Sequence, residues 1–131
     1  MRTRRLGKLE VSAVGLGCMG MSHAYGAPAD RKEMVDLVAF AVDNGVTLFD
    51  TAEVYGTKGE PHHNESLIGD ALKPYRDKVM ISTKFGLRFD YGSKSWNLPV
   101  IADSRPESIR QSIEGSLKRL QTDHVDIYFQ H

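Results

Sequence analysis

The chain has 131 residues, of which 40% are hydrophobic and 26% are charged, a balance that suits one packed globular domain and argues against disorder. Seventeen basic and seventeen acidic residues give a formal net charge of +0, so the charge balance offers no support for nucleic acid or an anionic membrane as a partner. The single cysteine, Cys18, excludes an internal disulfide. We expect a cytoplasmic chain, because no stretch has the pattern of a secretory signal or a membrane span.

The first predicted elements are short strands. Residues 4–11 alternate polar and apolar side chains around a glycine, which is typical of a small β-hairpin. Residues 12–18 predict a short buried strand. The glycines Gly15, Gly17 and Gly20 would let a ligand or another backbone approach closely, although core packing explains them equally well.

A helix and a buried strand follow. Asp30, with Glu33 three positions later, has the form of a capping box, and apolar residues at helical spacing continue until Gly45. Residues 46–50 (Val-Thr-Leu-Phe-Asp) form an apolar run without alternation, which is typical of a parallel strand covered on both faces. Residues 78–85 predict a second strand of this kind.

The remaining elements continue the alternation of helix and strand. We predict a helix over residues 64–72, an irregular loop over residues 87–103 and a final strand over residues 124–131. The loop holds Trp96, which either contacts a substrate or covers the core. Residues 104–107 form a second capping box, with Ser104 as the cap, and the apolar face of the helix behind it consists of Ile109, Ile113, Leu117 and Leu120.

After the hairpin the order is β-α-β-α-β-α-β, which predicts a parallel sheet with right-handed crossovers. Two architectures fit this order: an open doubly wound sheet and part of a (β/α) barrel. The spacing of Gly15, Gly17 and Gly20 differs from GxGxxG, which weighs against the dinucleotide-binding version of the open sheet.

Three successive strands end on ionisable side chains, Asp50, Lys84 and His131, and Tyr55 stands just after the first of them. The carboxyl ends of parallel strands share one edge, so these groups should meet. A phenol with an ordinary pKa of about 10 keeps its proton at neutral pH, and a neighbouring ammonium stabilises the phenolate that remains after transfer. Such a site would protonate a carbonyl oxygen while another group attacks the carbon. Alone, a strand-end Lys or Asp would equally suggest a structural ion pair.

Two other features have simpler explanations. His62 and His63, near Glu60 and Glu65, could bind a metal, but adjacent histidines in a charged loop are usually solvated, so we expect no metal site. Cys18 could be reactive, but a small buried residue at a strand end is the better interpretation.

Five segments, in the same order and covering essentially the whole chain, resemble the N-terminal part of an aldo-keto reductase: residues 15–22, 49–56, 64–65, 81–86 and 126–131. The resemblance implies an α/β fold, the N-terminal half of a (β/α)8 TIM barrel preceded by a small β-hairpin. Residues 1–131 would then be a single domain that is incomplete as a barrel.

By this resemblance Asp50, Tyr55, Lys84 and His131 match the catalytic tetrad of the family. Tyr55 would be the proton donor, Lys84 and Asp50 would tune it, and His131 would orient the carbonyl. The implied activity is that of an oxidoreductase that converts an aldehyde or ketone to the alcohol.

The resemblance also implies NADPH as the hydride donor. Its nicotinamide would lie near Gly17, Cys18, Met19 and Asp50. The family's second half carries most of the contacts to the adenine and the phosphates.

Two alternatives to carbonyl reduction stay open. One is a non-catalytic regulatory or binding protein that keeps the reductase fold. The other is an inactive half barrel that self-associates, because a half barrel has two unpaired strand edges and an uncovered apolar interior. The expected partners are therefore a small carbonyl substrate and a second copy of the chain, with neither nucleic acid nor a membrane.

Overall fold

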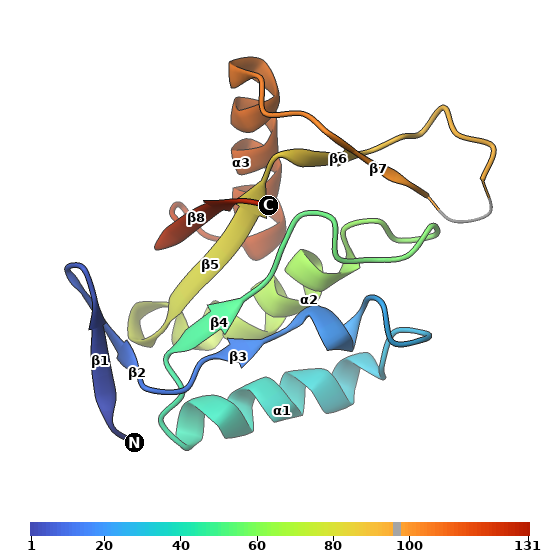
Figure 1. Ribbon diagram of the computed structural model, residues 1–131. Coiled ribbons are helices and arrows are strands. Elements are labelled where there is room, and N and C mark those ends of the chain that lie inside the picture. Colours follow the sequence, from blue (N-terminus) through green and yellow to red (C-terminus); the bar gives the residue numbers. More distant parts are fainter. Residues whose placement is uncertain (96–97) are drawn as a thin grey trace.

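The computed structural model describes residues 1–95 and 98–131 (Figure 1), so Trp96, for which the sequence left two roles, lies outside the described residues. A four-stranded parallel sheet forms the centre, in the order β3-β4-β5-β8. Its strands are β3 (Leu16–Gly17), β4 (Leu48–Asp50), β5 (Met80–Phe85) and β8 (Ile127–Gln130). Each is shorter than the strand that the sequence predicted at its place, but their carboxyl ends agree with the prediction to within one residue.

Three helices connect successive strands of this sheet: α1 (Arg31–Asp43), α2 (His63–Leu72) and α3 (Pro106–Leu120). They pack side by side in chain order, α1 against α2 and α2 against α3. The strands also follow chain order without a reversal, so the sheet winds in one direction, as the first half of a (β/α) barrel does. The predicted half barrel is confirmed, and the doubly wound alternative is excluded.

The N-terminal hairpin is confirmed. Strands β1 (Thr3–Leu6) and β2 (Leu9–Ser12) pair antiparallel, and Gly7 turns the chain with a φ of 60°. The predicted strand over residues 12–18 is wrong in its first part. Ser12 belongs to the hairpin, where it pairs with Thr3, and only Leu16–Gly17 enter the central sheet.

A second hairpin is formed by the two ends of the predicted irregular loop. Strands β6 (Leu87–Phe89) and β7 (Val100–Ala102) pair antiparallel, so the prediction for residues 87–103 is wrong at both ends. Each strand is only three residues long and β7 is exposed throughout, so neither shows the alternation that marks a half-buried strand.

The helix caps follow the sequence in one case and depart from it in the other. Asp30 caps α1, and its carboxylate accepts the backbone N–H of Glu33 at 2.9 Å, as the capping box predicted. Ser104 does not cap α3. Asp103 lies one residue earlier and accepts the backbone N–H of Arg105 at 3.3 Å, while Pro106, the first helical residue, has no N–H to satisfy.

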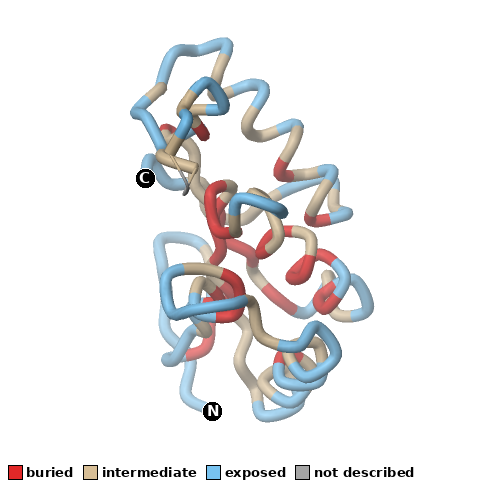
Figure 2. Tube along the Cα trace, turned by 90° about the vertical axis from the view of Figure 1, so that its right-hand side faces the viewer, coloured by how far each residue is buried: buried red, intermediate tan, exposed pale blue. Residues whose placement is uncertain are grey.

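The core lies between the sheet and the helices. Phe49 of β4 and Ile81 of β5 are paired in register, and both are fully buried on the helix side. Figure 2 shows the buried positions gathered in the middle of the molecule, with the N-terminal end exposed. The opposite face of the sheet is only partly covered, as Phe129 of β8 shows with 50% exposure. The expectation that these strands are covered on both faces is therefore wrong within the described residues.

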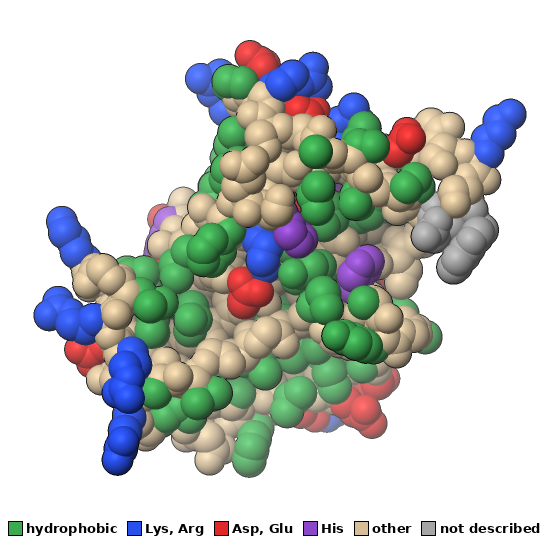
Figure 3. All heavy atoms as spheres, viewed as in Figure 1, with side chains coloured by type: hydrophobic (Ala, Val, Ile, Leu, Met, Phe, Trp, Pro, Cys, Tyr) green, Lys and Arg blue, Asp and Glu red, His purple; other side chains and the backbone are tan. Residues whose placement is uncertain are grey.

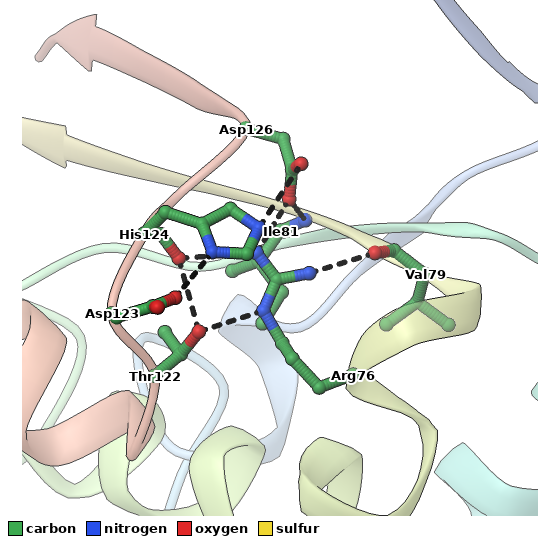
Figure 4. Close-up of polar contacts among 7 residues, drawn as sticks. All are labelled: Arg76, Val79, Ile81, Thr122, Asp123, His124 and Asp126. Atoms are coloured by element: carbon green, nitrogen blue, oxygen red, sulfur yellow. Dashed lines mark hydrogen bonds and ion pairs between the residues drawn. The ribbon is translucent and has the colours of Figure 1, made fainter.

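The amino ends of β5 and β8 are joined by Arg76, which lies in η2 (Lys73–Lys78) after α2. Its guanidinium donates to the Thr122 hydroxyl, to the carbonyls of Val79 and His124, and to the Asp126 carboxylate, over 2.9 to 3.1 Å (Figure 4). The same Asp126 oxygen accepts the Ile81 N–H at 2.8 Å. This end of a barrel ordinarily serves stability, and the contacts here fit that role. Within the described residues, no helix combines the length and apolar character that crossing a membrane requires.

Candidate active site

Strand register places Asp50 and Lys84 on one face of the sheet. Asp50 pairs with Ser82 in the parallel ladder of β4 and β5. Side chains alternate along a strand, so Lys84, two residues beyond Ser82, projects from the same face as Asp50. The neighbouring Thr83 points the other way and donates to Glu65 of α2 at 2.6 Å.

Asp50 and Lys84 form an ion pair at the carboxyl end of the sheet. The Lys84 ammonium donates to the Asp50 carboxylate at 2.7 Å and to the Thr51 carbonyl at 2.8 Å. The Ser82 hydroxyl donates to the other Asp50 oxygen. Both strand-end charges are thereby fixed, and the side chain of Lys84 is only 15% exposed.

Tyr55 is held against this pair by the loop after β4. Its ring centre lies 4.9 Å from the Lys84 ammonium, and the residue is 8% exposed. The loop is tied down at both ends, because the Tyr55 N–H donates to the Ala52 carbonyl and the Tyr55 carbonyl accepts the Asn64 N–H. Tyr55 therefore has a fixed place beside the largely covered Lys84 ammonium.

His131 completes the group directly after β8. Its backbone N–H donates to the Phe85 carbonyl at 2.7 Å. Its ring meets the Tyr55 ring edge to face, with 5.7 Å between the ring centroids. Partial burial lowers the pKa of His131, the charge of Lys84 lowers it further, and Asp50 opposes them. In Figure 3 an acidic, a basic and a histidine side chain adjoin at the centre of this face. The structure thus brings together the four residues that the sequence singled out.

The four positions assigned to the nicotinamide differ in their access to the site. Gly17 pairs with Asp50 in register, and a side chain there would meet open space. Met19 begins η1 (Met19–Met21) just beyond. Cys18 is fully buried in the core, where burial, with a contribution from the charge of Asp50, raises the pKa of its thiol to about 12. Cys18 is therefore a small buried residue at the end of a strand, as the sequence interpretation held.

Two site residues were missed by the sequence reasoning. His23 stacks on Tyr55, with 5.9 Å between ring centroids and 23° between the planes. Asn64 is fully buried and bridges three segments, because it accepts from the Thr51 hydroxyl and donates to the Cys18 carbonyl and to Ser22. Asn64 belongs to a segment that carries the family resemblance, which was the available signal. The sequence around His23 contains no signal that would identify it as a site residue.

The adjacent histidines His62 and His63, at the start of α2, each have a hydrogen-bond partner within the fold. His62 Nδ1 lies 2.6 Å from the Glu53 carbonyl, and His63 Nδ1 lies 2.7 Å from the Ser22 hydroxyl. The part of the chain that the structure describes contains no group of three or more His, Cys, Asp or Glu side chains arranged to hold a metal.

A cavity of about 600 Å³ opens beside Tyr55. Its wall combines residues that follow Tyr55 in the chain with residues from two other loops, among them His23, Ala24, Gly56, Lys58, Phe89 and Leu98.

Comparisons with known proteins agree with the fold. The sequence profile of the aldo/keto reductase family matches residues 13–131. A curated Glycine max protein named as an aldo-keto reductase is 41% identical over 123 residues, which are 93% of this chain and 33% of that protein. The chain therefore spans about a third of that relative's length.

Solved structures give the same result. A crystal structure described as an aldo-keto reductase of Pseudomonas aeruginosa has a TM-score of 0.81 at 34% identity, over 98% of this chain and 46% of that chain. An aldo-keto reductase of Klebsiella pneumoniae in complex with NADPH has a TM-score of 0.66 at 28% identity, over 93% of this chain and 36% of that chain. The chain belongs to the aldo-keto reductase family, and it corresponds to the first part of the family's barrel.

Proposed function

We propose that this site reduces an aldehyde or ketone to the alcohol with NADPH as the hydride donor and Tyr55 as the general acid. The observation that carries the proposal is the Lys84 ammonium, fixed by Asp50 at 2.7 Å and placed 4.9 Å from the Tyr55 ring. Membership of an oxidoreductase family that acts on small carbonyl compounds supports the same reaction.

Each side chain has one task in this reaction. Tyr55 donates its proton to the carbonyl oxygen as that oxygen gains negative charge. Lys84 stabilises the phenolate that remains, and Asp50 holds the Lys84 ammonium in place. His131 has a lowered pKa, so its ring is neutral at pH 7 and donates a hydrogen bond to the same oxygen without competing for the proton.

The open side of Gly17 and the half-exposed carboxylate of Asp50 leave room for a flat ring over the end of β3 and β4. Gly17, Met19 and Asp50 would hold the nicotinamide there, while Cys18 would contribute its backbone only. When bound, NADPH supplies the hydride that the carbonyl carbon receives. The NADPH complex of the Klebsiella relative supports this choice of cofactor.

Self-association is the competing prediction. Within the described residues the outer strands β3 and β8 each have one free edge, and Phe129 is half exposed on the inner face. A second copy could cover these edges. Light scattering after size exclusion, over a range of concentrations, would give a dimer mass if they pair, and a monomer mass throughout would contradict the prediction.

The test of the proposed function is a titration of the purified chain with NADPH, followed by the fluorescence of the nucleotide, before and after an aldehyde is added. Micromolar binding with oxidation after the addition is the expected result. No binding at millimolar nucleotide would contradict carbonyl reduction by these residues alone.

A further inference from the structure

Asn64, in the first turn of α2, is fully buried, and both ends of its side-chain amide have partners. Its Oδ1 accepts the Thr51 hydroxyl at 2.6 Å, and its Nδ2 donates to the Cys18 carbonyl at 2.8 Å and to the Ser22 hydroxyl at 2.9 Å. All three partners are fully buried as well. A carbonyl oxygen can only accept, so the amide nitrogen must face Cys18, and the amide oxygen then faces Thr51. An asparagine side chain is therefore the one that matches these donors and acceptors.

Two bonds of Asn64 lie one step from the proposed catalytic group. The Thr51 backbone carbonyl accepts the Lys84 ammonium at 2.8 Å, so the bond between the Thr51 hydroxyl and Asn64 holds the residue that anchors Lys84. The backbone N–H of Asn64 donates to the Tyr55 carbonyl at 3.0 Å. The same residue therefore fixes both the anchor of the ammonium and the loop that carries the proposed proton donor.

The amide nitrogen connects Asn64 to the end of a further strand. Cys18 accepts Nδ2 at its carbonyl and donates its backbone N–H to the Asp50 carbonyl at 2.8 Å. The ends of β3 and β4 are thereby tied to the first turn of α2. A buried polar network of this kind holds one arrangement, because a displacement leaves a buried group without its partner.

We infer that Asn64 is a positioning residue that sets the separation between the Lys84 ammonium and the Tyr55 ring, through the Thr51 carbonyl and through its own backbone N–H. The inference rests on the proposed carbonyl reduction and adds a residue to its machinery. Asn64 acts through Thr51 and the loop of Tyr55, whereas Tyr55 itself supplies the proton.

The activity test uses two variants of different severity. Asn64→Ala removes three hydrogen bonds at once, so it is expected to lower stability as well. Thr51→Val keeps the shape of the side chain and removes only the hydroxyl. We expect kcat to fall about 10-fold in Thr51→Val and about 100-fold in Asn64→Ala, with KM for the aldehyde within about 2-fold, because a displaced acid costs rate more than binding.

Three controls separate positioning from a general loss of packing. Thr51→Ser keeps the hydroxyl and should lose less kcat than Thr51→Val. The double variant of Asn64→Ala and Thr51→Val should lose no more kcat than Asn64→Ala alone, because both changes break the same bond. Asn44→Ala, at the exposed end of α1, is the matched asparagine control and should leave kcat and KM unchanged.

A second measurement follows the position of Lys84 without turnover. Partial burial lowers the pKa of His131, the charge of Lys84 lowers it further, Asp50 opposes them, and His23 adds a smaller decrease. Thr51→Val changes no charge, so a rise in the NMR titration midpoint of His131 reports an ammonium that has moved away. We expect such a rise in Thr51→Val, smaller than the rise in Lys84→Met.

The outcomes distinguish this inference from the proposed function. A Thr51→Val variant with the parent kcat, or equal losses in Thr51→Val and Thr51→Ser, would overturn the inference. An unchanged His131 midpoint in Thr51→Val would overturn it as well. A rise in that midpoint without NADPH oxidation by the parent chain would overturn the proposed function and support Asn64 as the residue that positions Lys84.

Discussion

Asp50 and Lys84 are joined by a 2.7 Å ion pair at the carboxyl end of adjacent parallel strands. The pair exists because register sets Asp50 opposite Ser82, and strand alternation brings Lys84 to the same face. It places a fixed positive charge within reach of both Tyr55 and His131. The charge of Lys84 therefore contributes to the lowered pKa of His131, and Asp50 opposes it.

Lys84→Met should raise the pKa of His131. Burial and the Lys84 charge hold that pKa below its ordinary value of 6.5, while Asp50 opposes them. Removing the ammonium leaves Asp50 unopposed, so the imidazolium becomes more favourable. An NMR titration of the His131 ring measures the midpoint. Lys78→Met, an exposed lysine at the other end of the sheet, should leave it unchanged, and a midpoint that stays or falls in Lys84→Met would contradict the assignment.

The same lowered pKa has a consequence for stability. Between the folded pKa of His131 and 6.5 the unfolded chain binds more protons than the folded chain. The contribution of His131 to the free energy of unfolding is therefore constant above 6.5 and decreases as the pH falls through that window.

Tyr128→Phe should leave the free energy of unfolding unchanged within about 0.5 kcal/mol, or raise it, because the Tyr128 hydroxyl is buried without a hydrogen-bond partner among the described residues. Burial raises the pKa of this phenol, and the charges of Glu53 and Glu65 raise it further. Thr83→Val is the contrasting variant. Its hydroxyl donates to the fully buried Glu65 carboxylate at 2.6 Å, so its loss should cost about 2 kcal/mol. Urea unfolding of both variants measures the two changes in the free energy of unfolding. A larger loss of stability for Tyr128→Phe than for Thr83→Val would contradict this prediction.

Arg76→Met should destabilise the fold by about 3 kcal/mol, since it removes the donors that join the amino ends of β5 and β8 and leaves the largely buried Asp126 carboxylate without its ion-pair partner. Thermal unfolding and urea unfolding both report the loss. Arg110→Met, on the exposed side of α3, should stay within about 0.5 kcal/mol of the parent. Similar values for the two variants would show that the contacts in Figure 4 contribute little.

Gly69→Ala should separate α2 from α3. A Cβ at Gly69 would meet the Arg119 carbonyl oxygen and would lie 2.8 Å from Leu120 Cα, and neither backbone atom can move aside cheaply. We expect a loss of about 3 kcal/mol, at the upper end of the usual cost of overpacking. Gly59→Ala, where the added methyl meets open space, serves as the control, and equal stability of the two variants would contradict this packing.

The sequence predicted elements whose signals are local. Each of these signals lies within one short stretch of sequence. They are the cap formed by Asp30, the helical periodicity of the apolar face of α3, and the charged residues that end β4 and β5. The proximity of Asp50, Lys84 and His131 followed from these strand ends, because parallel topology brings them to one edge.

What the sequence could not predict depends on distant partners. A glutamate in a helix is usually exposed, yet Glu65 is fully buried. Arg119 of α3 forms an ion pair with its carboxylate, and the Thr83 hydroxyl of β5 donates a hydrogen bond to it. The stacking of His23 on Tyr55 arises from two loops that meet only in the folded chain. The β6 and β7 strands are too short to show alternation, so their pairing leaves no local signal.

The most direct test of the proposed reaction is the rate of NADPH oxidation by Tyr55→Phe with a saturating aldehyde. Removing the general acid should lower kcat about 10³-fold while NADPH binding stays within about 2-fold of the parent, since the ring and its contacts with Lys84 and His131 are kept. Tyr75→Phe, in η2 at the far end of the sheet, should retain full activity. A Tyr55→Phe variant that turns over at the parent rate would contradict the assignment of Tyr55 as the proton donor.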